Sequence, residues 1–152
     1  MKLLRKMLTF AVVATMLFVS GCSKDNEPKA AKEQNKIVTY YTIDGIWQLA
    51  QWNGAALAEG THLYIALDRK EHRFEMWDNL NSMYTVMTSG NFELSADDMD
   101  RDIIFGWYDY GVGDWNDRYA VVLNAEGNRM VWSAVSSNEE MIFVKVDELP
   151  EF

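Results

Sequence analysis

Short apolar runs with a period of two residues, separated by turn residues, occupy the sequence from residue 37 onward. This alternation is typical of half-buried β-strands, and no segment sustains the 3.6-residue period of an amphipathic helix. Eight or nine short strands are predicted, over residues 45–53, 61–67, 72–77, 83–88, 91–94, 102–108, 118–124, 129–135 and 140–146. A kink at Gly90 is expected to separate the fourth strand from the fifth. Residues 55–59 are expected to form one helical turn at most.

Short connections between strands favour an antiparallel meander, and closure into a barrel removes the exposed edges that such a sheet would otherwise have. We therefore predict an all-β fold, an antiparallel up-and-down meander that closes into a barrel of about eight strands. Some of these strands are apolar on both faces, because Ile103 and Phe105 alternate with Ile104. The outer face is then expected to be partly covered or used for contacts.

Charge limits the partners of this domain. Residues 37–152 hold seven lysines and arginines against twenty acidic residues, a net charge of −13. Such a surface repels nucleic acid and anionic lipid head groups, so no nucleic-acid partner is expected. Cys22 is the single cysteine of the chain, so no disulfide within one molecule supports the fold.

The N-terminus reads as a targeting segment. Residues 1–6 are basic and residues 7–19 are apolar. The apolar run is shorter than the roughly twenty residues that a membrane-spanning helix needs, and it fits a signal peptide. It ends in Val19-Ser20-Gly21-Cys22, which resembles the bacterial lipobox. The resemblance implies cleavage after Gly21 and transfer of diacylglycerol to the Cys22 sulfur. The alternative is an ordinary secretory signal with an incidental cysteine.

Residues 23–36 contain no aromatic or large aliphatic residue and are predicted to be a flexible tether. Residues 23–27 resemble the acidic export signals of surface-exposed lipoproteins in Bacteroidetes-type bacteria, with an ordinary polar linker as the alternative. The expected organisation is a signal peptide over 1–21, lipidated Cys22 with its tether over 22–36, and a barrel over 37–152. The expected location is the cell envelope, with acyl chains on Cys22 in the outer membrane and exposure at the cell surface left open.

The start of the barrel domain carries a family resemblance. Gly45-Ile46-Trp47 resembles the Gly-x-Trp signature that opens the first strand of lipocalins. Residues 130–132 and 141–146 look like the lipocalin-like domains of bacterial lipoproteins, and the resemblance covers residues 43–147. It implies a lipocalin-like, calycin-type barrel in which Trp47 plugs the closed end. An arginine packs over that tryptophan in the family, and Arg118 and Arg129 are the candidates here.

Catalytic motifs are missing from the sequence. Lipid would consume the Cys22 thiol, and the sequence holds no Gly-x-Ser-x-Gly, His-Glu-x-x-His or Gly-rich phosphate loop. We therefore predict no catalytic residue, no cofactor and no enzymatic activity. A hydrolase that uses a pair of carboxylates is the least supported hypothesis.

Two residue patterns bear on metal binding. If residues 68–71 form a turn, Leu67 lies opposite His72 and His62 lies opposite Trp77. The two imidazoles would then be roughly 17 Å apart and could not share a metal. Residues 98, 100 and 102 are alternating aspartates, but no glycine lies within the triplet and no bidentate glutamate follows, so a solvated acidic loop is expected and not a calcium site.

A group of aromatic residues surrounds three glycines late in the sequence. It comprises Trp107, Tyr108, Tyr110 and Trp115. Such rings can line a binding mouth because they stack on sugars and apolar ligands, and the alternative is that they cap the core. The predicted function is a non-enzymatic binding module for a small apolar or sugar-like ligand. The alternative is an accessory or structural subunit of an outer-membrane protein complex, with another envelope protein as its partner.

Overall fold

The computed structural model describes residues 34–111 and 113–152. The predicted signal peptide, Cys22 and most of the tether lie outside the described residues. Lys32–Phe152 forms one compact unit. In the described part of this unit, no helix is long and apolar enough to span a membrane.

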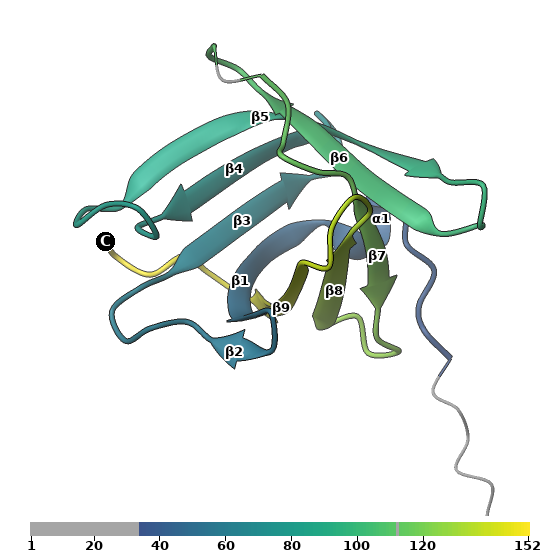
Figure 1. Cartoon of the computed structure of the whole chain (residues 1–152), viewed down its shortest axis with the longest axis horizontal. Coiled ribbons are helices and arrows are strands. Elements are labelled where there is room, and N and C mark those ends of the chain that lie inside the picture. The colour runs from purple at the N-terminus through teal and green to yellow at the C-terminus, as the bar shows by residue number, and fades with distance from the viewer. Residues whose placement is uncertain (1–33, 112) are drawn as a thin grey trace, which may run out of the picture. The chain divides into compact units, whose positions relative to one another are not determined.

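A single antiparallel sheet makes up nearly all of the described domain (Figure 1). Eight of its strands lie side by side in chain order: β1 (Gly45–Trp52), β3 (Leu63–Asp68), β4 (Arg73–Asp78), β5 (Val86–Ala96), β6 (Asp102–Tyr108), β7 (Tyr119–Leu123), β8 (Arg129–Ala134) and β9 (Glu140–Val146). The last of these, β9, pairs with β1 and closes the barrel. This architecture confirms the predicted all-β meander of about eight strands, and it fits a lipocalin-like barrel.

The additional strand, β2 (Ala55–Ala56), forms a small hairpin with the end of β1. The expectation of a helical turn over residues 55–59 is therefore wrong for Ala55 and Ala56, which form a strand. The turn residues Asn53 and Gly54 have φ angles of 51° and 79°. Asn-Gly favours this left-handed pair because glycine has no Cβ and asparagine tolerates positive φ, so the local sequence specifies a hairpin.

Strand β5 runs without interruption through Gly90, so the predicted kink is wrong. Gly90 is buried and lies opposite Phe74 in the sheet. A Cβ at this position would collide with the backbone of Trp107 and the ring of Phe74. The glycine is needed because the next strand approaches closely, and not because the chain bends.

The turn between β3 and β4 differs in register from the prediction. Leu67 pairs with Phe74 and Leu63 with Asp78, so the expected pairs of Leu67 with His72 and of His62 with Trp77 are wrong by two residues. The carboxylate of Asp68 accepts hydrogen bonds from the amides of Lys70 and Glu71, at 2.7 and 2.9 Å. These bonds favour a turn over residues 69–72, beginning one residue later than expected.

A short helix, α1 (Tyr40–Ile43), lies at one end of the barrel and leads into β1. Trp47 is fully buried here, and its Nε1 donates a hydrogen bond to the Ile43 carbonyl at 2.8 Å. The Lys145 ammonium lies 5.2 Å from the centre of the Trp47 ring. Because Trp47 and Lys145 are direct partners between β1 and β9, barrel closure brings them together.

The expectation that Arg118 or Arg129 packs over Trp47 is therefore wrong. Arg118 instead lies over the ring of Phe105, at 4.6 Å. Arg129 is exposed at the start of β8. The lysine occupies the position over Trp47 because its strand, β9, pairs with β1, whereas β7 and β8 do not.

Candidate ligand-binding site

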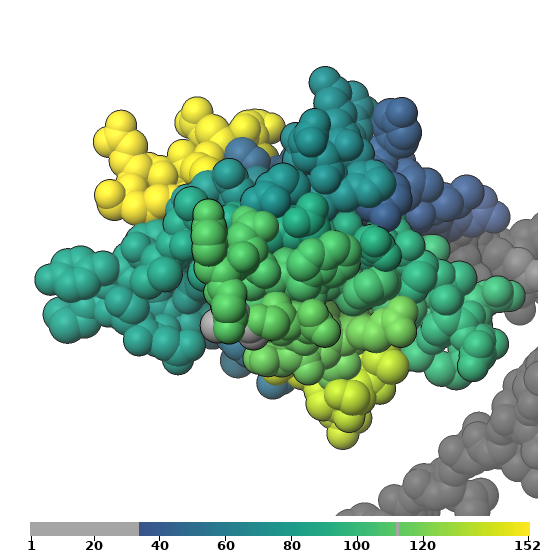
Figure 2. Space-filling view, turned by 90° about the horizontal axis from the view of Figure 1, so that it is seen from above, coloured from purple at the N-terminus to yellow at the C-terminus, as the bar shows by residue number. Residues whose placement is uncertain are grey.

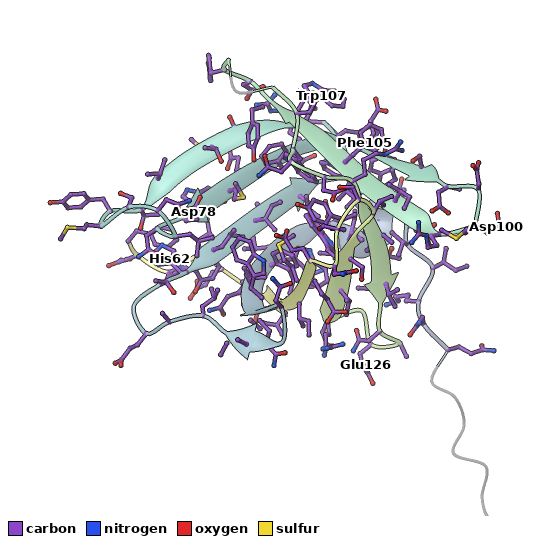
Figure 3. The ribbon with its side chains drawn as sticks, in the orientation of Figure 1. His62, Asp78, Asp100, Phe105, Trp107 and Glu126 are labelled. Carbon is purple, nitrogen blue, oxygen red and sulfur yellow. The ribbon has the colours of Figure 1, made fainter. Side chains whose placement is uncertain are left out.

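The connections β1–β3, β4–β5, β6–β7 and β8–β9 lie at the end of the barrel away from α1, which we call the far end. All four aromatic residues of the predicted mouth lie near it, but they do not share one surface. Trp107 is exposed on the outside of β6 (Figure 3), and Tyr110 is 86% exposed. Tyr108 and Trp115 instead pack against the core. The structure therefore brings Tyr108 and Trp115 together and separates them from the other two.

Trp115 fills a gap in the barrel wall. Strands β6 and β7 pair only through Ile103–Ala120 and Ile104–Tyr119. Beyond these pairs the β6–β7 connection folds back onto β6, where the Trp115 amide donates to the Gly106 carbonyl at 2.8 Å. A Cβ on Gly106 would lie 2.7 Å from the Trp115 ring. The missing side chain at Gly106 thus gives the indole room to lie against the strand.

The Trp115 ring continues into an aromatic layer inside the barrel. Its centre lies 5.1 Å from that of Phe74 and 5.5 Å from that of Trp132. Trp132 in turn packs on Phe143, with centres 4.9 Å apart. Trp132 lies on the inner face near the β8–β9 connection at the far end, whereas Phe74 lies next to the β3–β4 turn at the α1 end. The aromatic layer therefore runs through the core from one end of the barrel toward the other.

Two buried side-chain atoms have no hydrogen-bond partner among the described residues: Trp132 Nε1, in this layer, and Thr88 Oγ1, on β5. Trp132 alternates along β8 with exposed or half-buried residues and faces the core. Thr88 lies two residues before the buried Gly90 on β5, so it faces the same side of the sheet. Leaving a buried polar group unpaired costs about 1–3 kcal/mol, and such groups are normally paired by protein, water or ligand.

Further polar groups lie at the far end. Burial, and then the Asp78 carboxylate, raises the pKa of Tyr108. Burial, followed by the charges of Glu139 and Asp117, raises the pKa of Tyr119. Both phenols therefore keep their protons at neutral pH. Asp78 ends β4 and lies four residues after Phe74, so the alternation of the strand places both on the same face.

We call this set of residues the far-end wall. Its members share a position on or next to the inner face of a strand at the far end: Asp78, Thr88, Tyr108, Trp115, Tyr119 and Trp132. It combines aromatic surface with hydroxyl, indole N–H and carboxylate groups. Such a wall can hold an apolar ring or chain and hydrogen-bond one polar group.

Hollows on the outside of the barrel are lined by other residues than those of the far-end wall. One of about 410 Å³ is lined by Ile46, Ala66, Glu75 and neighbouring residues of β1, β3 and β4. Its only lysine or arginine, Arg73, is already paired with Asp109, and this contact holds the pKa of the Asp109 carboxyl below its usual value. Another hollow, of about 270 Å³, lies beside residues 35–38 and β7. None of the four predicted mouth residues lines either hollow.

Metal-binding geometry is missing from the part of the chain that the structure describes, where no group of three or more His, Cys, Asp or Glu could hold an ion. His62 stacks on Phe152, whereas His72 stacks on Tyr40. In the acidic loop, Asp97 pairs with Arg101 through a side-chain contact that lowers the pKa of the carboxyl.

Sequence reasoning did not single out Thr88 or Trp132 as site residues. The period-two pattern placed both in strands, but it could not show which polar atoms would lack partners. That depends on the side chains that neighbouring strands bring to the same place. No protein-family model matches the chain, and no match is found among curated proteins or solved structures.

Proposed function

We propose that this chain is a lipid-anchored lipoprotein of the cell envelope, in the outer membrane, whose barrel is a non-enzymatic binding module for a small apolar or sugar-like ligand. The observation that supports it most directly is the pair of buried, unpaired atoms, Thr88 Oγ1 and Trp132 Nε1, in an otherwise apolar interior. A ligand with a hydrogen-bonding group within reach of either atom would remove the cost of leaving that atom unpaired.

The far-end wall suits both ligand classes. Apolar ligands would pack on the rings of Trp115 and Trp132, and a sugar could stack on the same rings. The protonated hydroxyls of Tyr108 and Tyr119 would serve as hydrogen-bond donors or acceptors. The wall would open for a ligand if the β6–β7 connection moved and carried Trp115 with it.

Anchoring is the part of this proposal that rests on the N-terminal sequence. Replacing Cys22 with alanine is expected to abolish lipid attachment, because the acyl acceptor is then missing. Two or more acyl chains make membrane attachment effectively permanent, so the effect should be close to all or none. Labelled palmitate and detergent phase partitioning measure it. A variant that still incorporates label would refute the lipobox interpretation.

Ligand binding can be separated from stability by Thr88→Val, which replaces a hydroxyl with a methyl of nearly the same volume. Without ligand, this change should leave the free energy of unfolding unchanged or raise it, because it removes an unpaired buried hydroxyl. Binding should weaken by about tenfold, which corresponds to ~1.4 kcal/mol for one lost hydrogen bond. The probes are N-phenyl-1-naphthylamine for apolar ligands and octyl glucoside for sugar-like ones, followed by tryptophan fluorescence.

A matched control for this experiment is Thr61→Val, in the β1–β3 connection outside the far-end wall. It should leave probe binding unchanged. If Thr88→Val lowers stability by 1 kcal/mol or more and does not alter binding, the hydroxyl is paired with an ordered water and the ligand proposal loses its main support.

The alternative function, an accessory subunit of an outer-membrane complex, is favoured by a different observation. Several large apolar residues near the far end are exposed, including Met83, which is 91% exposed. Contiguous apolar surface of this kind marks interaction sites in soluble domains. Retention of another envelope protein through purification, and its loss on replacing Met83 with lysine, would support this alternative.

A further inference from the structure

Strand β5 extends beyond its neighbour β6 at the far end of the barrel (Figure 1). The pairing of β5 with β6 reaches Gly90, opposite Tyr108, where β6 ends. One more hydrogen bond follows, from the Asp109 amide to the Ser89 carbonyl at 3.0 Å. Residues 86–88 pair with β4 on their other side. On the β6 side no described residue pairs with residues 86–88, so they form a free sheet edge.

The main-chain groups of Met87 point toward this free side. In an antiparallel sheet, the amide and carbonyl of one residue face the same neighbouring strand, and alternate residues face opposite strands. The Ser89 carbonyl faces the β6 side, and the Phe92 amide faces the β4 side, where it donates to the His72 carbonyl at 2.9 Å. Met87 is two residues from Ser89, so its amide and carbonyl face the β6 side. Among the described residues, no hydrogen bond outside the strands involves either group.

The stretch of chain at this edge is largely apolar and carries no charge, with Asp78 beside Val86 and the Arg73–Asp109 ion pair beside Ser89 at its borders. Residues 79–92 contain no acidic or basic residue, in a domain whose net charge is −13. Met87 is 54% exposed, and the neighbouring Met83, Tyr84 and Val86 are exposed as well. Figure 2 shows the β4–β5 connection as a teal protrusion at one side of the molecule. Natural proteins usually protect free edges with charged residues or proline, and residues 79–92 themselves contain neither.

A row of large side chains leads to this edge across the outer face of the sheet. Tyr64 on β3 is the direct partner of Trp77 on β4, and Trp77 is the direct partner of Met87 on β5. Side chains of direct partners lie on the same face of a sheet. The free edge therefore combines unpaired main-chain groups with an adjoining apolar surface.

We propose that two copies of this chain associate through this edge, with the Met87 residues of both copies paired antiparallel about a two-fold axis. Met87 presents one donor and one acceptor, so a two-fold axis places each opposite its counterpart. The two rows of Tyr64, Trp77 and Met87 would then join into one. We favour a second copy over another partner for a reason of charge. Two acidic domains repel each other least where residues 79–92 of one copy, which carry no charge, meet the same residues of the other. The pairing uses the edge of both copies, so the assembly closes at two.

The test uses the full chain in detergent micelles and the variant Met87→Cys. Directly opposed residues that exchange hydrogen bonds have Cα atoms ~5.5 Å apart, within the range that a disulfide spans. Mild oxidation should therefore convert most of this variant to a disulfide-linked dimer on a non-reducing gel. Val122→Cys is the matched control, because Val122 lies on the outer face of β7 and is 45% exposed, comparable to the 54% of Met87. That variant and the wild type should stay uncrosslinked.

Sedimentation of the same protein gives an independent result. Met87→Lys places two like charges opposite each other and should shift the chain to monomer, whereas Val122→Lys should not. Added salt should strengthen the wild-type dimer, since it screens repulsion between the acidic domains. A wild-type chain that is monomeric at every concentration and salt overturns the proposal. So does a Met87→Cys variant that crosslinks to a different protein and not to itself.

Discussion

Replacing Trp47 with alanine is expected to lower the free energy of unfolding by ~3–5 kcal/mol. Trp47 is one of the largest fully buried side chains of the described domain. Its removal would leave a cavity between the core and α1, and the Ile43 carbonyl would lose its hydrogen bond from the indole. The Lys145 side chain would lose the aromatic face beneath its ammonium group. All three effects act in the same direction.

A loss of this size would remove much of the stability of the domain. Single domains are typically stable by ~5–15 kcal/mol, and no disulfide supports this one. Urea denaturation of the compact unit Lys32–Phe152 measures the effect. Trp107→Ala is the matched control, since Trp107 is exposed on the outer face and should contribute under ~1 kcal/mol. Equal effects of the two substitutions would contradict the buried role of Trp47.

A further substitution, Trp47→Phe, separates volume from hydrogen bonding. It keeps most of the apolar ring but leaves the buried Ile43 carbonyl without its donor. The expected loss is about 1–3 kcal/mol, smaller than for alanine. If Trp47→Phe is as damaging as Trp47→Ala, the hydrogen bond to α1 matters more than the filled volume.

Trp115→Ala is expected to lower the free energy of unfolding by about 2–3 kcal/mol, part of the cost for a fully buried aromatic residue. A tryptophan among glycines and aspartates is typical of an exposed loop, and the sequence alone therefore predicts a much smaller effect. The structure changes this expectation, because the ring lies against Gly106 and packs on Phe74 and Trp132. Its removal would leave a gap between β6 and β7, where the two strands share only two residue pairs.

The control for Trp115→Ala is Tyr110→Ala, in the same connection but 86% exposed, which should change stability by less than ~0.5 kcal/mol. Urea denaturation and probe binding are measured on both variants. If Trp115 gates the far-end wall, its loss should also change the affinity for the apolar probe. If Trp115→Ala is as damaging as Trp47→Ala and leaves binding unchanged, the ring belongs to the core and the binding-mouth hypothesis should be abandoned.

The four aromatic residues show why a cluster in the sequence does not make a site. Trp107 and Tyr108 are neighbours in β6, so their side chains point to opposite faces of the sheet. Tyr110 lies in the connection that follows, where its ring is exposed. Only Trp115 returns to the inner side with Tyr108, because the connection folds back along β6. Proximity along the chain predicted that the four aromatic residues form one group. The alternation of side chains along β6 instead places Trp107 and Tyr108 on opposite faces of the sheet.

The sequence by itself determined the class of fold, since the period-two alternation and the turn residues are local properties and each strand carries its own signal. It also determined the strongly acidic character of the domain and the lipobox-like pattern before Cys22. The tertiary structure alone decided which residues meet across the barrel. Lys145 reaches Trp47 because β9 closes on β1, and Trp115 fills the wall because β7 diverges from β6. Thr88 Oγ1 and Trp132 Nε1 lack partners among the described residues, and Met87 faces an open edge. The physical reason is the same, because each feature depends on strands that are distant in sequence or of unequal length, and no local pattern records that.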